Sequence, residues 1–233
     1  GGVRKSGGGA GGLQRCLANP QVFERVVQGV WAWGAQNPAG AFTLCAADNP
    51  DGWCECAACR ALGAIAGHYK HTTLFHRFFS RAVQSVLARN PEARLDIRFY
   101  IDRGVAPEDP DIQYRGRNVR GVYCTCWPHA RCYAHAFTDP DCPLNAKCLA
   151  DLRGVLAICP RLYTYEYIEA SDIPYAPIEH TLARDIRDLA ALGVEGFMNS
   201  THPPGSKSLA YRPASPYVWQ ARWASIYLTS KLH

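Results

Sequence analysis

The chain contains 233 residues, of which 48% are hydrophobic and 11% aromatic, a composition typical of folded globular proteins and not of disordered ones. Its formal net charge is a modest +5 and no run of Lys and Arg exceeds two residues, which argues against a nucleic-acid-binding surface. No stretch approaches the roughly 18 apolar residues that a membrane-spanning helix needs.

Residues 1–12 are rich in glycine and lack the apolar core of a signal peptide. We expect this segment to be flexible and to precede a single domain at 13–233. Because the chain starts without Met, we also expect it to be a fragment or a processed product, with an upstream domain in its parent chain.

Helices are predicted from capping residues and apolar spacing. The first follows Asn19, a favoured N-cap residue, with Pro20 at the first helical position, and ends near Asn37. A second is expected at about 73–88, where apolar residues recur at four-residue spacing: Leu74, Phe78, Ala82 and Val86. Further helices are expected at 144–158, at 178–191 before a C-cap residue, Gly193, and from about Pro216.

Strands are predicted between these helices, at 41–47, 95–101, 118–124, 161–168 and 194–198. Strands that alternate with helices indicate βαβ units and a mainly parallel sheet, hence an α/β fold. Five strands suit a doubly wound sheet or the later part of an eight-stranded (β/α) barrel of TIM type. We favour the barrel, incomplete and without its first strands, because the N-terminus resembles that of a fragment.

The loop after the first strand carries the densest chemistry. Residues 48–59, DNPDGWCECAAC, combine two carboxylates and three thiols with turn-forming Pro and Gly. Loops at the carboxyl ends of strands are where α/β proteins keep their functional groups. Asp48 is therefore a candidate ligand contact, although Asp before Asn-Pro is also ordinary turn chemistry.

Five segments in one order resemble the bacterial family catalogued as domain of unknown function 4838. The likeness runs from about Leu13 to Thr201, and its most specific element is Cys-x-Cys-x-x-Cys-x-Ala-Leu after an Asp/Asn turn. The matching segments are 16–20 (CLANP), 52–62 (GWCECAACRAL), 118–119 (NV), 141–145 (DCPLN) and 193–196 (GVEG). The resemblance implies a (β/α) barrel related to glycoside hydrolases such as α-glucuronidases. It also implies a secreted or periplasmic setting and a polysaccharide or glycan partner.

A glycosidase needs two carboxyl groups across the scissile bond. Glu166 and Asp48 are the predicted pair, with Asp102, at the end of the second strand, as a further substrate contact. Alternation along the strand places Glu166 on the face opposite Tyr163 and Tyr165, and therefore inside the barrel if the tyrosines point outward. The alternative for Glu166 is a salt-bridged or solvent-facing side chain.

Asn199 marks a departure from the family pattern. The family commonly has a Glu at this position, after Gly-Val-x-Gly-x-x, whereas an Asn can bind a sugar hydroxyl but cannot act as a general base. Trp53 and Trp127 lie in predicted strand-end loops, where a flat ring can stack on a sugar. These residues suit substrate binding even without cleavage.

The eleven cysteines leave several alternatives open. Cys54, Cys56 and Cys59 can ligate a structural zinc ion, with Cys16 as the fourth ligand that the resemblance implies. A disulfide between Cys16 and a loop thiol is an equal alternative, and free buried thiols are a third. A second group, Cys124, Cys126, Cys132 and Cys142, surrounds His129 and His135. A metal site is one alternative here, although the spacing matches no strong zinc signature, and the resemblance implies that Cys124 and Cys142 can pair. Nothing in the sequence places a His beside a particular Cys, so a thiol hydrolase is disfavoured.

Two hypotheses therefore follow from the sequence. The first is a glycoside hydrolase-like protein that acts on a polysaccharide or glycan through strand-end carboxylates and requires no cofactor beyond the possible structural zinc. The second is a non-catalytic carbohydrate-binding or scaffold module on the same barrel fold.

Overall fold

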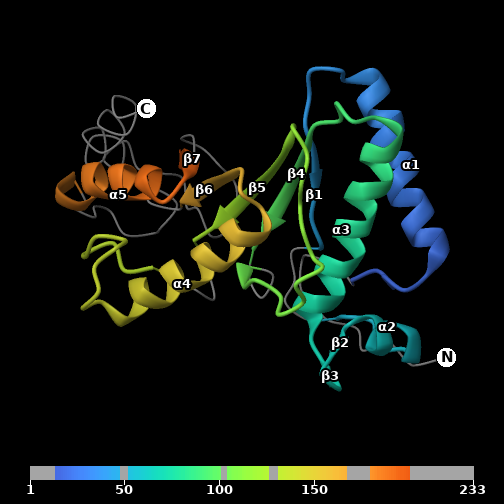
Figure 1. Ribbon diagram of the computed structural model, residues 1–233, viewed down its shortest axis with the longest axis horizontal. Helices are drawn as coiled ribbons and strands as arrows, with labels where there is room; N and C mark the ends of the chain where they lie inside the picture. The colour runs from blue at the N-terminus through green and yellow to red at the C-terminus, as the bar shows by residue number, and fades with distance from the viewer. Residues whose placement is uncertain (1–13, 48–51, 101–103, 126–130, 167–178, 200–233) are drawn as a thin grey trace, which may run out of the picture.

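The computed structural model describes residues 14–47, 52–100, 104–125, 131–166 and 179–199 (Figure 1). A five-stranded sheet with the order β1-β4-β5-β6-β7 forms its centre, and every neighbouring pair of strands is parallel. The strands are β1 (Phe42–Leu44), β4 (Leu95–Phe99), β5 (Val119–Cys124), β6 (Leu162–Glu166) and β7 (Val194–Asn199). The fold is therefore α/β, as predicted, and the strands follow one another across the sheet in chain order.

Helices connect the strands of this sheet. The long ones are α1 (Pro20–Gln36), α3 (His71–Arg89), α4 (Pro143–Ile158) and α5 (Glu179–Ala191). A short helix, α2 (Ala57–Leu62), and an antiparallel hairpin of β2 (Ala64–Ile65) and β3 (His68–Tyr69) lie between β1 and α3. No helix in the described ranges is long and apolar enough to cross a membrane.

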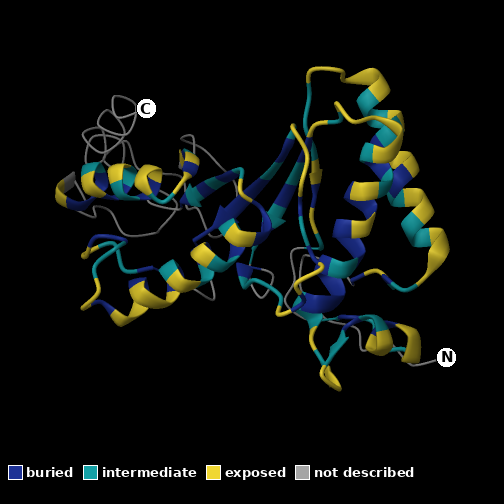
Figure 2. Ribbon diagram, viewed as in Figure 1, coloured by how far each residue is buried: buried dark blue, intermediate teal, exposed yellow. Residues whose placement is uncertain are grey.

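The two faces of the sheet differ in chemistry. Leu95, Ile97 and Phe99 alternate along β4 and are fully buried toward α3, where the Phe99 ring stacks 5.4 Å from that of His76. Helix α4 covers the same face of β5, since the Tyr123 hydroxyl donates to the Cys148 carbonyl. We call this the helix face. Figure 2 shows that the strands of the sheet are mostly buried, while the sides of the helices that point away from the sheet are exposed.

The opposite side, which we call the polar face, carries half-buried residues that include charged and phenolic groups: Asp96, Arg98, Arg120, Tyr163 and Tyr165. Asp96 and Arg120 are direct neighbours in the parallel register of β4 and β5. A bulge between Leu162 and Tyr163 shifts the register of β7, so that Gly196 lies opposite Tyr163. Strand alternation thus separates an apolar side from a polar one.

Most element boundaries agree with the sequence predictions. The Asn19 side chain caps α1 by accepting from the Gln21 amide at 2.9 Å, and Pro20 occupies the first turn. Gly193 leaves α5 with φ of 94°, which glycine adopts without steric cost. The predicted apolar positions of α3 are all buried.

Three local predictions differ from the structure or lie beyond it. Strand β1 is shorter than the predicted 41–47, because the Gln14 side chain pairs with both the amide and the carbonyl of Ala47 at 3.0 Å, in place of a neighbouring strand. The segment α2–β2–β3 was not predicted. The glycine-rich segment 1–12 and the Trp-rich helix expected from Pro216 fall outside the described residues.

Gly121 is needed where β5 packs tightly on the helix face. A Cβ atom there would collide with Leu162 and lie only 2.9 Å from the Phe99 ring. We expect Gly121→Ala to lower the free energy of unfolding by about 1–3 kcal/mol, the usual cost of overpacking. Gly104→Ala is the matched control, because its nearest neighbour would be 3.7 Å away. Equal denaturant midpoints for the two variants would contradict this expectation.

Candidate metal centre and strand-end site

Four cysteines from separate parts of the chain meet beside α2. The sulfur atoms of Cys16, Cys54, Cys56 and Cys59 all lie within 4.8 Å of one another. The Cys16 sulfur is 3.9 Å from that of Cys56 and 3.6 Å from that of Cys59, and all four thiols are free. Tetrahedral thiolate coordination with metal–sulfur bonds of about 2.3 Å places sulfurs about 3.8 Å apart. The cluster can therefore hold a metal ion.

Local structure brings these thiols together. Cys56 is the N-cap of α2, and its sulfur accepts from the Cys59 amide at 3.5 Å, so one helical turn aligns the two residues. Cys16 lies in the turn before α1, which is closed by a hydrogen bond from the Asn19 amide to the Cys16 carbonyl. The Tyr69 hydroxyl contacts the Cys54 carbonyl at 3.4 Å and holds the loop against β3.

The thiols differ in acidity. The Cys59 amide, which donates to the Cys56 sulfur, lowers the pKa of Cys56 to about 7 from its ordinary value of 9.0. Burial instead raises the pKa values of Cys16 and Cys59. Cys56 is therefore more readily deprotonated than Cys16 and Cys59, and a cation would stabilise those two as thiolates.

Trp53, predicted as a sugar platform, packs inside this loop. Its indole ring stacks on the His71 ring at 5.2 Å with an interplanar angle of 16°, and only 7% of the residue is exposed. The side chain therefore joins the thiol loop to the start of α3. Its burial leaves little ring surface for a ligand.

Glu166 ends β6 on the helix face and is completely buried. Its Oε2 accepts hydrogen bonds from the Thr125 hydroxyl at 2.7 Å and the Tyr133 hydroxyl at 3.0 Å, and lies 3.6 Å from Nη1 of Arg131. Arg131 also forms an ion pair with Asp185 of α5. Burial raises the pKa of Glu166, and the positive charge of Arg131 opposes that rise.

This arrangement defines the side of β6 on which Glu166 lies. Alternation does place it opposite Tyr163 and Tyr165, as predicted. The tyrosines lie on the polar face, and Glu166 lies on the helix face, where it is near Arg131, the partner of Asp185 in α5. Among the described residues, Glu166 forms an ion pair with Arg131, which corresponds to the salt-bridged side chain that the sequence analysis gave as the alternative.

The other predicted site residues are not brought together by the described part of the chain. Asp48, Asp102 and Trp127 lie outside the described residues, as does the side chain of Asn199. The backbone of Asn199 pairs with Glu166 at the carboxyl ends of β7 and β6.

Residues that the sequence analysis missed line the polar face. The Arg98 guanidinium lies 5.4 Å from the centre of the Tyr165 ring, and that of Arg120 lies 5.4 Å from the Tyr163 ring. Burial raises the pKa of the neighbouring carboxyl group of Asp96, although Arg120 and Arg98 oppose that rise. The alternation of Leu, Asp, Ile, Arg and Phe in 95–99 was the available signal, since it predicts a strand with one charged side.

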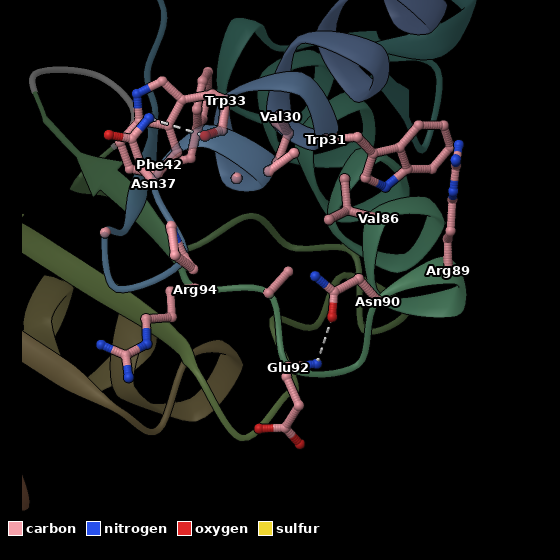
Figure 3. A pocket seen from close by; sticks show the side chains of 15 residues that line it. Val30, Trp31, Trp33, Asn37, Phe42, Val86, Arg89, Asn90, Glu92 and Arg94 are labelled. Atoms are coloured by element: carbon pink, nitrogen blue, oxygen red, sulfur yellow. Dashed lines mark hydrogen bonds between the residues drawn. The ribbon is translucent and has the colours of Figure 1, made fainter.

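A cavity of about 360 Å³ opens at the other end of the sheet (Figure 3). Its lining includes Phe42, at the start of β1, and Arg94, just before β4. The Arg89 guanidinium stacks 4.3 Å from the Trp31 ring at its rim. The amino ends of parallel strands usually contribute stability, whereas ligands bind at the carboxyl ends, so this cavity is a weaker functional candidate than the thiol loop.

No curated protein and no solved structure matches this chain. The profile of one family matches residues 2–232, nearly the whole chain. This match agrees with the resemblance found in the motif order and the thiol loop. The chain belongs to the family described as Domain of unknown function (DUF4838).

Proposed function

We propose that this protein is a carbohydrate-binding segment of a TIM-type (β/α) barrel, in which a structural zinc ion fixes the loop after β1. The strand order supports the barrel: five parallel strands follow chain order, whereas a doubly wound sheet reverses its order at a switch point. The helices α3, α4 and α5 contact one face, which in a barrel is the outer face, and the polar face is then the interior.

The zinc proposal rests on the four-thiol cluster, the observation that carries most weight here. Four sulfurs within 4.8 Å of one another match the ligand set of closed structural zinc sites. Such a site has no coordination position left for water or substrate, so its role is to fix the loop and not to catalyse. The fixed loop leaves the carboxyl end of β1, the edge where α/β proteins bind ligands.

Carbohydrate binding is supported by the chemistry of the polar face near that edge. Arg98 and Tyr165 combine hydrogen-bond donors with an aromatic ring, which is the combination that holds sugar hydroxyls and pyranose faces. Hydrolysis requires two carboxyl groups roughly 5–10 Å apart in one pocket. Since Arg131 and α5 enclose Glu166, binding without cleavage accounts better for its position. The family resemblance further supports a glycan partner and an exported parent protein.

A glycan-binding screen tests this function. The full chain is titrated with uronic-acid and hexose oligosaccharides by calorimetry, and turnover of the matching glycosides is followed in parallel. We expect binding without turnover, and a loss of at least about tenfold in affinity for Tyr165→Ala, equivalent to about 1.4 kcal/mol. Arg153→Ala, which removes an exposed side chain of α4, is the control and should bind normally.

Two outcomes would contradict the proposal. Turnover that disappears in Glu166→Gln would establish a hydrolase and assign that residue a catalytic role. Equal affinities of Tyr165→Ala and Arg153→Ala for every bound glycan would move the binding site away from the polar face.

A further inference from the structure

A second cluster of metal-ligating side chains lies in the loop between β5 and α4. The ligand atoms of Cys132, His135 and Cys142 lie within 4.8 Å of one another, and the Cys132 sulfur is 3.2 Å from Nδ1 of His135. The structure thus places a His beside a Cys, a neighbourhood that the sequence alone did not establish. In Figure 1 this loop lies beside α5, toward the β7 edge of the sheet, whereas α2 lies toward the β1 edge.

We infer that Cys132, His135 and Cys142 form a second metal site, for a divalent ion of the zinc class. Two thiolates and one imidazole are preferred zinc ligands, and tetrahedral coordination places a bound sulfur and nitrogen about 3.6 Å apart. The observed separation between the Cys132 sulfur and Nδ1 of His135 needs a change of only about 0.4 Å to reach this value. Cys142 supplies the third ligand atom from the N-cap of α4.

The backbone of this loop is held in place by one buried side chain. Asn145 is fully buried in the first turns of α4. Its Nδ2 donates to the carbonyls of Cys132, His135 and Ala136 at 2.9–3.1 Å, and its Oδ1 accepts from the Cys132 amide at 2.8 Å. Asn145 therefore fixes both ends of the segment that carries two of the three ligands. Metal sites commonly rely on hydrogen bonds of this kind, which hold the ligating residues in the geometry that the metal ion needs.

Helix α5 holds the same loop from the other side. The Thr181 hydroxyl donates to the Tyr133 carbonyl at 3.3 Å, and the Asp185 carboxylate accepts from the Phe137 amide at 2.6 Å. With contacts from both α4 and α5, little conformational freedom is left to lose when a metal ion binds. This preorganisation favours a site over a chance approach of three side chains.

The number of ligands sets the chemistry of this site. Within the part of the chain that the structure describes, the group comprises two sulfurs and one nitrogen. Sites with three protein ligands keep a fourth position for water or another small ligand, whereas four-thiolate sites are closed. His135 is exposed to solvent. Among the described residues, the site at α2 thus offers four protein ligands and the site at α4 offers three.

Metal analysis of the full chain tests this inference. The protein is loaded with zinc or cobalt, and bound metal is counted by mass spectrometry after removal of free ions. We expect His135→Gln to lower the content from about two ions per chain to about one. The cobalt form should also lose an absorption component due to mixed sulfur and nitrogen coordination. Because His135 is exposed, this variant should keep the far-UV circular dichroism of the parent.

Three controls make the result specific. His68→Gln removes another exposed histidine and should retain both ions. His135→Cys restores a ligand atom and should recover the second ion. Cys59→Ser removes a ligand of the site at α2 only and should lose only that ion. The double variant Cys59→Ser/His135→Gln should therefore bind no metal ion. The two single variants show separately whether each site binds metal.

Two results would overturn the inference. One is an unchanged metal content in His135→Gln, with the cobalt spectrum of the parent. The other is a disulfide between Cys132 and Cys142 in peptide maps of the unreduced protein.

Discussion

Replacing Cys59 by Ser is expected to abolish binding of the proposed structural zinc ion and to lower the free energy of unfolding by about 4 kcal/mol. This value corresponds to a ligand present at about a thousand times its dissociation constant that binds only the folded chain. Cys59 is completely buried and lies 3.6 Å from the Cys16 sulfur, so serine leaves the cluster without its most enclosed ligand. The measurements are zinc content and the denaturant midpoint with and without a chelator.

Cys148→Ser is the matched control for this prediction. Cys148 is a buried thiol in α4 that belongs to neither cluster, so its replacement costs packing energy but should leave zinc bound. Chelation should destabilise the parent and Cys148→Ser equally, destabilise Cys59→Ser less because only the second site can still lose an ion, and leave the double variant Cys59→Ser/His135→Gln unchanged. If the chelator has no effect on the parent, the four thiols are packing residues and the proposed zinc site is wrong.

The zinc site should also respond to pH. Thiols must lose their protons to bind zinc, and the pKa of Cys56 in the metal-free cluster is already lowered to about 7. Zinc affinity should therefore already fall with decreasing pH above 7, because zinc must displace protons from Cys16 and Cys59, and should fall more steeply below about 7, where Cys56 is protonated as well. Control variants outside the cluster should show the same pH dependence as the parent.

Arg131→Met is expected to lower the free energy of unfolding by about 3–5 kcal/mol at neutral pH, because it leaves buried carboxylates unpaired. Arg131 lies between Glu166 and Asp185, and the side chains of all three are almost completely buried. Methionine is similar in length but carries no charge, so both carboxyl groups lose their cation. Denaturant unfolding of parent and variant at several pH values measures the effect.

The sign of the pH dependence follows from Glu166. Burial raises its folded-state pKa above the ordinary value of 4.5, so the folded state binds the proton more tightly than the unfolded state. Ionisation of this group therefore costs stability as the pH rises above 4.5. Without Arg131 the pKa rises further, and the deficit of Arg131→Met should grow as the pH rises through the folded-state pKa of Glu166 in the parent, which lies above 4.5.

Two further variants isolate this effect. The double variant Arg131→Met/Glu166→Gln removes the charge left by the single change and should recover part of the lost stability. Arg184→Met removes an exposed arginine of α5 that pairs with Asp188, and should cost less than about 0.5 kcal/mol. A pH-independent deficit in Arg131→Met would show that packing, and not the buried charges, explains its cost.

Helix and strand types followed from local patterns, but the thiol cluster required long-range packing. Asn19 and Pro20 predict the start of α1, and the apolar spacing of 73–88 predicts the buried side of α3, because capping and periodicity act within a few residues. The three loop thiols are close in sequence. Cys16 joins Cys59 across 43 positions, and among the sequence signals only the family resemblance indicated it.

Two site residues show the limit of local reasoning. Alternation by itself placed Glu166 opposite the tyrosines, because successive strand side chains point to opposite faces. It could not indicate which face the helices cover, since that depends on where α4 and α5 pack. Likewise, Arg131 follows no periodic pattern, and only the approach of α5 makes it the partner of Glu166.

The sequence by itself determined the α/β class, the order of helices and strands, and the presence of a chemically dense loop after β1. These depend on backbone preferences and on spacings of two to four residues, which each segment carries with it. Only the tertiary structure decided which other side chains meet: the Cys132–His135 pair and the buried charges around Glu166. The family resemblance had already grouped the four thiols, whose sulfur atoms the structure brings within 4.8 Å of one another. Such contacts join residues far apart in the chain, and their geometry is determined by how the helices pack on the sheet.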